Sequence, residues 1–313
     1  MSLRQSSTAL SSRLAVGLAS LAILVTAGCG TAAPEDDTAA GGGEEPKAEV
    51  GKLEKDAKAA GMLPADIKTA GVVSVASGVS FPPMEYFAED NKTVVGFDAD
   101  LGKALGEVLG VKFEFHNTNF DGIIGGLEAD RYDLGITAMI DKKERQAKVD
   151  FVDYMSSGVA FMVAKGNPKG LKEQMDLCGK TVAVEKSATG DLVADDISAA
   201  CVKAGKAKLN ELALPEQVAT LQALTSNRAD AVLALDLTLA YNVKQQPDAF
   251  ELPAEPFDKL PVGIPVPKSN PELRDAVQAA LLKVQESGAY DEMLEKWNVT
   301  DQALEGAPIN QGK

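Results

Sequence analysis

The sequence predicts an α/β protein in which mainly parallel sheets are flanked by helices on both faces. The main observation is that, from Gly71 onward, short runs rich in β-branched residues alternate with amphipathic helical runs. A second observation is the composition, because 45% of the 313 residues are hydrophobic but only 5% are aromatic. The chain therefore has enough apolar side chains for one large domain or two modest ones, with a core made mostly of aliphatic residues and alanine.

The first elements of this pattern are two strands with a helix between them. Residues 72–75 read Val-Val-Ser-Val, which is typical of a strand, and residues 111–116 alternate apolar and polar side chains with a period of two. A helix is predicted over residues 98–109, because Leu101 and Leu105 fall on the same helical face. This order is the one expected of a βαβ unit.

The rest of the body continues in the same way. Five further short aliphatic runs are predicted to be strands, at residues 134–139, 159–164, 181–184, 231–235 and 262–266. Near the C-terminus, Asn270, Pro271 and Glu272 supply a helix N-cap, a proline at the first helical position and an acid in the first turn, and Gly288 predicts the end of that helix.

Two proline-containing segments bracket the middle third of the body, at residues 165–168 and 252–256. Two crossings around an inserted segment are typical of two lobes joined by two strands. Such an arrangement permits hinge motion between the lobes.

The N-terminus has the features of a bacterial export signal. Arg4 and Arg13 precede an apolar run over residues 14–25, and the small residues that follow lead to Cys29. This ending resembles the lipobox of bacterial lipoproteins, which implies cleavage before Cys29 and attachment of lipid to its sulfur; an ordinary signal peptide or a buried helix with a chance cysteine is the alternative. We expect residues 1–28 to be a signal peptide and residues 29–64 to be the lipidated cysteine and a flexible tether, since the start of that segment is rich in Gly, Pro and acidic residues.

The two remaining cysteines, Cys178 and Cys201, flank a strand-like run and a helix-like run. In an exported protein they are predicted to form a disulfide, and the alternative is a pair of unpaired core cysteines.

The ionisable residues exclude several functions. His116 is the one histidine of the chain, so a metal site with two histidines is excluded. The net charge is −15 and becomes −17 without residues 1–28, which carry two arginines and no acid. A chain this acidic lacks the basic face that phosphate neutralisation needs, so we expect no nucleic acid partner.

Seven motifs, in order and across residues 65–300, resemble those of the family 3 extracellular solute-binding proteins, the polar-amino-acid receptors of bacterial ABC importers. In chain order they are Phe81–Tyr86, Gly96–Leu101, Asn119–Ile124, Lys143–Arg145 with Val149–Phe151, Gly179–Val184, Arg228–Leu233 and Gly288–Trp297. The resemblance implies the type II periplasmic-binding-protein-like fold, in which two α/β lobes close over a ligand. It places lobe 1 at residues 65–165 and 258–300, lobe 2 at residues 166–257 and a C-terminal tail at residues 301–313.

The same resemblance implies a set of ligand-binding residues. Arg145 matches the arginine that grips the ligand's α-carboxylate, and a planar guanidinium can do so bidentately. The other matching positions are two aromatic residues that stack on the ligand, a strand end that offers backbone carbonyl or hydroxyl groups to the ligand's amine, and a loop of the second lobe that meets the carboxylate. They are Phe81 and Phe120, Thr137 and Ala138, and Ser187 and Thr189, respectively.

Three positions depart from the family pattern. Ile140 and Ala188 replace hydroxyl residues, and Leu235 stands where the acid for the ligand's ammonium group is usual. The nearest carboxylate is Asp236, which a slip of one residue at the strand end would bring into use. Each lost charge-assisted hydrogen bond costs roughly 1.5 to 3 kcal/mol, so the scaffold is predicted more firmly than a standard α-amino acid ligand.

The function predicted first is a lipid-anchored, monomeric receptor at the cell surface, which closes on a small solute, most simply an amino acid or a similar compound, and presents it to an ABC permease. We expect no cofactor, no metal and no catalytic residue. One alternative is an enzyme of dehydratase or lyase type on the same scaffold, with Glu85 and Asp121 as an acid/base pair. The other is a sensory or adhesive surface module, which the departures at Ile140 and Leu235 would favour.

Overall fold

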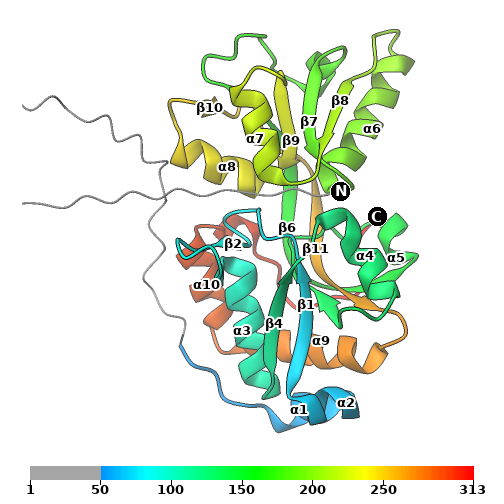
Figure 1. Cartoon of the computed structure of the whole chain (residues 1–313), viewed down its shortest axis with the longest axis vertical. Coiled ribbons are helices and arrows are strands. Elements are labelled where there is room, and N and C mark those ends of the chain that lie inside the picture. Colours follow the sequence, from blue (N-terminus) through cyan, green and yellow to red (C-terminus); the bar gives the residue numbers. More distant parts are fainter. Residues whose placement is uncertain (1–50) are drawn as a thin grey trace, which may run out of the picture. The chain divides into compact units, whose positions relative to one another are not determined.

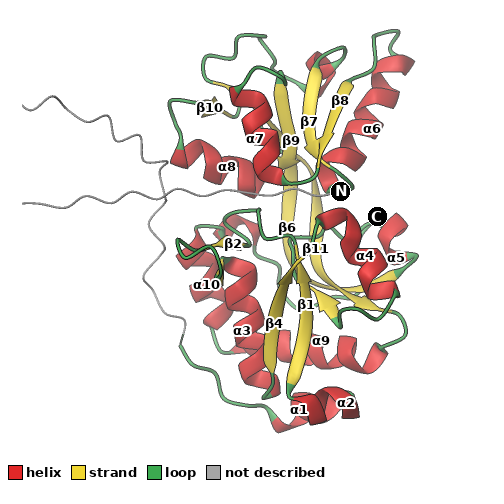
Figure 2. Ribbon diagram, in the orientation of Figure 1, coloured by secondary structure: helices red, strands yellow, loops and turns green. Residues whose placement is uncertain are grey.

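The structure is a computed structural model that describes residues 51–313 (Figure 1). The predicted signal peptide, Cys29 and most of the predicted tether lie outside the described residues. Two lobes of mixed α/β structure are present in the described part of the chain, each built on its own sheet (Figure 2).

The first lobe is built on a parallel sheet with the strand order β4-β1-β5. Its strands and helices, together with a small β2-β3 hairpin, are α1 (Ala57–Met62), α2 (Ala65–Ala70), β1 (Val72–Ser77), β2 (Tyr86–Phe87), β3 (Val94–Val95), α3 (Phe97–Leu109), β4 (Lys112–Asn117), α4 (Phe120–Glu128), β5 (Leu134–Gly135) and α5 (Lys143–Gln146). The predicted strand and helix order β1, α3, β4 is confirmed.

A glycine is required where α3 begins. Gly96 has a φ of 128°, and a Cβ atom there would lie 2.1 Å from the carbonyl oxygen of Met84. The close approach lets the backbone amides of Phe97 and Asp98 donate to the carbonyls of Pro83 and Met84. Gly96 therefore fixes the start of α3 against the loop that carries Glu85.

The second lobe is built on a mixed sheet in which β9, β7 and β8 are parallel neighbours. Its elements are a 3-10 turn η1 (Gln174–Leu177), β7 (Thr181–Glu185), α6 (Thr189–Lys203), β8 (Asn210–Leu214), α7 (Gln217–Thr225), β9 (Ala231–Leu235), α8 (Asp236–Gln245) and β10 (Phe250–Glu251). The disulfide between Cys178 and Cys201 is confirmed and ties the segment after η1 to α6, with the two Cα atoms 5.7 Å apart.

Two long strands run between the lobes. They are β6 (Val149–Ala164) and β11 (Phe257–Pro267), which pair with each other in antiparallel fashion. The pairing is mainly parallel elsewhere, as predicted, but β6 is antiparallel to β9, β10 and β11. The reason is topological, because the chain leaves the first lobe along β6 and returns along β11.

The C-terminal residues complete the first lobe. After α9 (Pro271–Glu286), α10 (Ala289–Trp297) and the turn η2 (Thr300–Gln302), the chain runs back along β6, with bridges from Ala303 to Met155 and from Ile309 to Val152. The side chain of Asn270 caps α9 by accepting from the Leu273 amide, as its sequence predicts.

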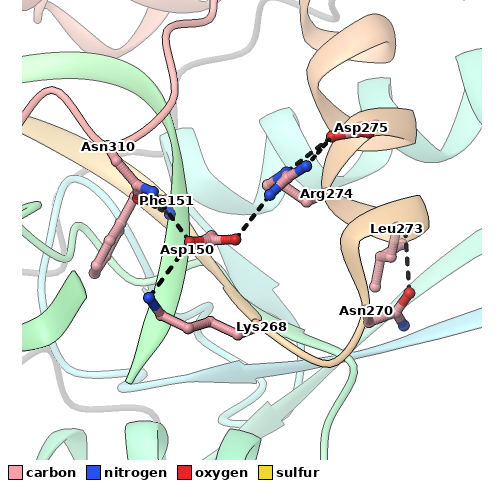
Figure 3. A network of polar contacts seen from close by, with 8 residues as sticks. All are labelled: Asp150, Phe151, Lys268, Asn270, Leu273, Arg274, Asp275 and Asn310. Atoms are coloured by element: carbon pink, nitrogen blue, oxygen red, sulfur yellow. Dashed lines mark hydrogen bonds and ion pairs between the residues drawn. The ribbon is translucent and has the colours of Figure 1, made fainter. Parts of the chain in front are cut away.

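A network of polar contacts holds these parts together at the start of β6 (Figure 3). Asp150 accepts from Arg274 of α9 at 2.8 Å and from the Asn310 amide at 3.0 Å, and the ammonium of Lys268 lies 3.9 Å away. Asn310 in turn accepts from the backbone amide of Phe151 at 2.8 Å. The final segment is thus bound to β6 and, through Asp150, to α9.

The predicted strand at residues 134–139 is shorter than expected, since β5 ends at Gly135. The physical reason lies at Ala138, whose φ of 45° is incompatible with an extended strand. The chain therefore bends away from the sheet at this point.

None of the helices in residues 51–313 has the length and apolar character that a membrane span requires.

Candidate functional site

A pocket lies where the carboxyl ends of strands from both lobes meet. It is lined from the first lobe by residues after β1 and β5 and at the start of α4, and from the second lobe by the ends of β7 and β9 and the starts of α6 and α7. The lining residues are Gly78, Phe81, Glu85, Phe120, Thr137, Ala138, Glu185, Ala188, Thr189, Gly190, Gln217, Leu233, Ala234 and Leu235. In open α/β sheets, this end of the strands is where ligands bind.

On the first lobe, the wall of the pocket is organised around Glu85, which is 1% exposed. One of its carboxyl oxygens accepts from the Thr137 hydroxyl at 2.8 Å, and that hydroxyl accepts from the Gly78 amide at 2.9 Å. The other oxygen, Oε2, has no hydrogen-bond partner among the described residues. Burial, and next the nearby carboxylate of Asp98, raise the pKa of Glu85 well above its usual range.

Asp98, at the start of α3, holds the backbone of this side of the pocket in place. Its carboxylate accepts from the backbone amide of Ala138 at 2.8 Å and from the Tyr154 hydroxyl at 2.7 Å. Burial raises the pKa of Asp98 to about 6, even though both hydrogen bonds favour the ionised form. The bond to Ala138 holds that residue in its left-handed conformation, so a side chain from α3 sets the backbone of the pocket.

On the second lobe, Glu185 and Gln217 face the same pocket. Glu185 is 5% exposed, and its pKa rises to about 8 because of burial and then of the negative charges of Glu216 and Asp121. Gln217 is 1% exposed, and its Nε2 atom has no partner within the described part of the chain. Neither Glu85 nor Glu185 forms an ion pair with any lysine or arginine of residues 51–313.

Arg145, the predicted carboxylate ligand, is buried next to the pocket but does not line it. Its guanidinium donates to the backbone carbonyls of Ile140 and Ser187, both at 2.8 Å, and lies 5.4 Å from the centre of the Phe120 ring. Burial lowers the pKa of Arg145 to about 10, so this group remains a cation. Ser187, like Ala138, has a positive φ, of 62°, and its carbonyl accepts from the arginine.

The structure brings most of the predicted site residues together. Five of them line the pocket directly: Phe81, Phe120, Thr137, Ala138 and Thr189. Two more, Arg145 and Ser187, contact each other at its edge. The departures at Ala188 and Leu235 also lie in the lining, so they do change the surface that a ligand would meet.

Asp236 is not brought into this pocket. Its carboxylate accepts from the Ser157 hydroxyl at 2.5 Å and from the Leu237 amide at 2.8 Å, at the first turn of its own helix. The register at the end of β9 leaves Leu235 facing the pocket and directs the next side chain elsewhere. No slip of one residue occurs in this structure.

Two polar lining residues, Glu185 and Gln217, were missed in the sequence. Glu185 ends a buried strand and Gln217 begins a helix. Polar residues are common at both kinds of position, so neither residue stood out in the sequence. The available signal was an acid directly after the apolar run Val182–Val184. Asp121, the other member of the acid/base pair considered above, forms an ion pair with Lys186 at 2.8 Å and does not line the pocket. Among the described residues, no cluster of three or more His, Cys, Asp or Glu side chains could hold a metal ion.

Comparison with known families agrees with this geometry. The profile of the bacterial extracellular solute-binding proteins, family 3, matches residues 73–300. The chain belongs to this family. The prediction of an exported solute-binding protein is therefore confirmed at the level of the family, and the predicted two-lobed fold is confirmed with it.

Individual relatives are similar over most of their length. The arginine-binding protein ArgT of Corynebacterium glutamicum is 26% identical over 253 residues, which cover 80% of this chain and 82% of that protein. The L-cystine-binding protein TcyJ of Escherichia coli K12 is 28% identical over 74% of this chain and 84% of its own. A solved structure of an ancestral arginine-binding protein bound to arginine has a TM-score of 0.67 and 35% identity over 72% of this chain and 98% of that one. These proteins are named for binding and not for catalysis.

Proposed function

We propose that the protein is the receptor of an amino acid ABC importer and that it binds its solute in the pocket between the two lobes. The observation that carries this proposal is that one buried pocket takes its lining from both sheets. A solute there touches both lobes at once, so binding favours the closed arrangement over an open one. The similarity to named arginine-, cystine- and glutamine-binding proteins supports an amino acid or a close analogue as the solute.

Several contacts join the lobes directly and would form as the pocket closes. Arg145 reaches the carbonyl of Ser187. Lys186 pairs with Asp121, and the Thr238 hydroxyl donates to the carbonyl of Pro82. These contacts lie around the pocket and support the closed arrangement, and the solute adds the contacts inside it.

We assign the pocket residues to three parts of an amino acid. Phe81 and Phe120 provide apolar walls with few rotatable bonds. The start of α6, at Thr189 and Gly190, presents backbone amides that suit the α-carboxylate. The carbonyl and hydroxyl groups around Thr137 suit the ammonium group.

Arg145 acts on the carboxylate from the edge of the pocket in this proposal. Its two bonded N–H groups orient the guanidinium beside Phe120 and the α6 loop. The guanidinium does not line the cavity, but its positive charge, buried in an acidic protein, attracts the carboxylate of the solute.

The position of the protein in the cell and its domain limits belong to the same proposal. Attachment of lipid to Cys29, with residues 29–64 as cysteine and tether, would keep a monomeric receptor near the permease. The lobe limits of 65–165 with 258–300 and of 166–257 stay predictions, as does the tail at 301–313. The pairing of β6 residues 159–162 with β9 favours a crossing inside β6, a few residues earlier than its end at Ala164.

A thermal-shift screen with the common amino acids tests the proposal, and small-angle scattering tests the closure. A solute present at 100 times its dissociation constant should stabilise the folded protein by about 2.7 kcal/mol. The same solute should reduce the radius of gyration. A protein that binds no amino acid, or binds one without becoming more compact, contradicts the proposal.

A further inference from the structure

The segment after η2 lies outside the family match but is built into the first lobe. The family profile ends at residue 300, whereas residues 303–313 continue along β6 and reach α5. The Asp153 amide of β6 donates to the Pro308 carbonyl at 2.9 Å. The chain end marked C lies beside α5 in Figure 1, and the Lys143 amide donates there to the Lys313 carbonyl at 3.4 Å. The motifs of the family therefore do not account for the contacts of this segment with α5.

Gly312 of this segment forms a closed set of hydrogen bonds with Asp141 and Gln146. The Gly312 amide donates to Oδ2 of Asp141 at 2.6 Å, and the side-chain amide of Gln146 donates to Oδ1 of the same carboxylate at 2.7 Å. The Gln146 side chain also donates to the Gly312 carbonyl at 3.2 Å. Asp141 is fully buried and Gln146 is 9% exposed, so water competes little for these bonds. We call these three residues the C-terminal clamp.

The clamp requires a glycine at position 312. A Cβ atom there would lie 2.0 Å from the carbonyl oxygen of Asp141 and 2.7 Å from the Cγ atom of that residue. The carbonyl oxygen belongs to the backbone, which cannot move aside as the end of a flexible side chain can. A side chain at position 312 must therefore push the segment away from the loop before α5.

The same loop and helix carry Arg145. The helix α5 spans four residues, which are too few to form a stable helix without support from neighbouring segments. Asp141 directly follows Ile140, whose carbonyl accepts from the Arg145 guanidinium, and Gln146 directly follows Arg145. The clamp thus holds the chain on both sides of the arginine.

The loop before α5 is also fixed to β11. The Asp141 amide donates to the Pro261 carbonyl at 2.9 Å, and Ile140 forms a bridge with Val262. Loss of the clamp leaves these contacts with β11 in place but removes the support at the end of α5. A guanidinium that must reach the carbonyl of Ser187 in the other lobe depends on a backbone held in position.

We propose, on the basis of the function proposed above, that the C-terminal clamp positions Arg145 for the carboxylate of the solute. Gly312, Asp141 and Gln146 are positioning residues, because each acts on the solute through Arg145 and none of them lines the pocket. A segment outside the family match thereby contributes to the affinity of the pocket. A segment with a purely structural role would contribute to the free energy of unfolding alone.

Another contact of the same segment supplies a matched control. The side-chain amide of Gln285, on α9, donates to the carbonyls of Leu304 and Gly306 at 3.0 and 2.9 Å. Gln285→Met and Gln146→Met therefore remove the same chemical group and the two hydrogen bonds that its nitrogen donates. Both variants should lower the melting temperature, since each leaves acceptors without their donor. Only Gln146→Met removes a member of the clamp.

Calorimetry with the common L-amino acids and L-cystine as probes tests the proposal. For the probe that the parent binds most tightly, Gly312→Ala and Gln146→Met should each reduce affinity at least about threefold, and by no more than Arg145→Ala does. Gln285→Met should leave affinity unchanged. Thermal unfolding of each variant verifies that it is folded at the temperature of the calorimetry.

A double-mutant cycle separates positioning from stability. Both clamp variants are made again in the Arg145→Ala background, where the guanidinium is absent. We expect each to change affinity there by less than about twofold, because the position of an absent group cannot affect binding. A merely structural contribution would instead reduce affinity by the same factor in both backgrounds.

The outcomes separate this inference from the proposed function. Parent affinity in either clamp variant, an equal loss in Gln285→Met, or a loss that persists undiminished in the Arg145→Ala background overturns the role of the clamp, while the protein remains an amino acid receptor. If one clamp variant does not fold, the other decides by the same criteria. Absence of binding for every probe in the parent overturns the proposed function itself, and this inference with it.

Discussion

The guanidinium group of Arg145 donates a hydrogen bond of 2.8 Å to the backbone carbonyl of Ser187, which joins α5 of the first lobe to the loop before α6 of the second. The same group donates to Ile140 at 2.8 Å, within its own lobe. Because the arginine is 5% exposed, both bonds lie away from competing water. This side chain is therefore both a buried charge beside the pocket and a link between the lobes.

Replacement of Arg145 should weaken closure and binding together. In Arg145→Ala the carbonyls of Ile140 and Ser187 lose their donor, and loss of such charge-assisted bonds costs roughly 1.5 to 3 kcal/mol, or about one to two decades of solute affinity. Calorimetry and small-angle scattering check this, and the variant without solute should also be more expanded than the parent. Arg145→Lys is the control for charge, since a lysine keeps the cation but cannot serve both carbonyls in a planar fork. Unchanged affinity and unchanged radius of gyration in the alanine variant would remove Arg145 from the site.

The second cross-lobe contact, between Lys186 and Asp121, should matter much less. The Nζ atom of Lys186 lies 2.8 Å from the Oδ2 atom of Asp121, but the side chains are 60% and 33% exposed, respectively, so solvent and salt screen the pair. We expect Asp121→Asn to change solute affinity by less than about fivefold, which corresponds to the usual upper value of about 1 kcal/mol for such pairs. Affinity should also vary little between low and high salt. A loss as large as that of Arg145→Ala would show that this pair is part of the closing mechanism.

The disulfide should stabilise the second lobe without affecting the site. Cys178 and Cys201 are 23 positions apart and neither lines the pocket. Replacement of both by serine should lower the free energy of unfolding by about 3 kcal/mol in the chain-entropy account. Denaturant unfolding measures this change. Calorimetry at 25 °C should show that the variant binds the solute with the same affinity as the parent. A free-thiol assay on the parent that finds two reactive thiols contradicts the bridge.

The solute-free protein should lose stability as pH rises from about 4.5 to about 8. The pKa of Glu185 rises from 4.5 in a free chain to about 8 in the folded protein, because burial disfavours its ionised form. An acid with a raised folded pKa favours the folded state fully below the unfolded value, and this contribution is lost as pH rises through the folded value.

Thermal unfolding at a series of pH values checks this prediction. The melting temperature of the parent should fall across that interval, and Glu185→Gln, which cannot ionise, should show a smaller fall. Asp195→Asn, at an exposed position of α6 in the same lobe, serves as the control and should follow the parent. A Glu185→Gln profile identical to that of the parent would mean that Glu185 does not contribute to the change.

Much of the scaffold could be predicted because its signals are local. The alternation of short aliphatic runs with helical faces predicted β1, α3, β4, β7 and β9, and the cap at Asn270 predicted the start of α9. These elements depend on the polarity of neighbours two to four residues apart, which the sequence displays directly. The motifs also predicted the family and five of the residues that line the pocket.

The arrangement of the site depended on contacts between residues far apart in the chain. Asp98 bonds to Ala138 and bends the end of β5, and Arg145 is turned toward Ser187, which is 42 positions away. No local pattern could indicate that Glu85 and Glu185 face one pocket, because their approach depends on how two lobes are brought together by β6 and β11. The amino-acid sequence thus determines which elements form and the family to which they belong. The charge that the pocket presents is set by tertiary packing, since burial and distance from other charges decide whether an acid there keeps its proton.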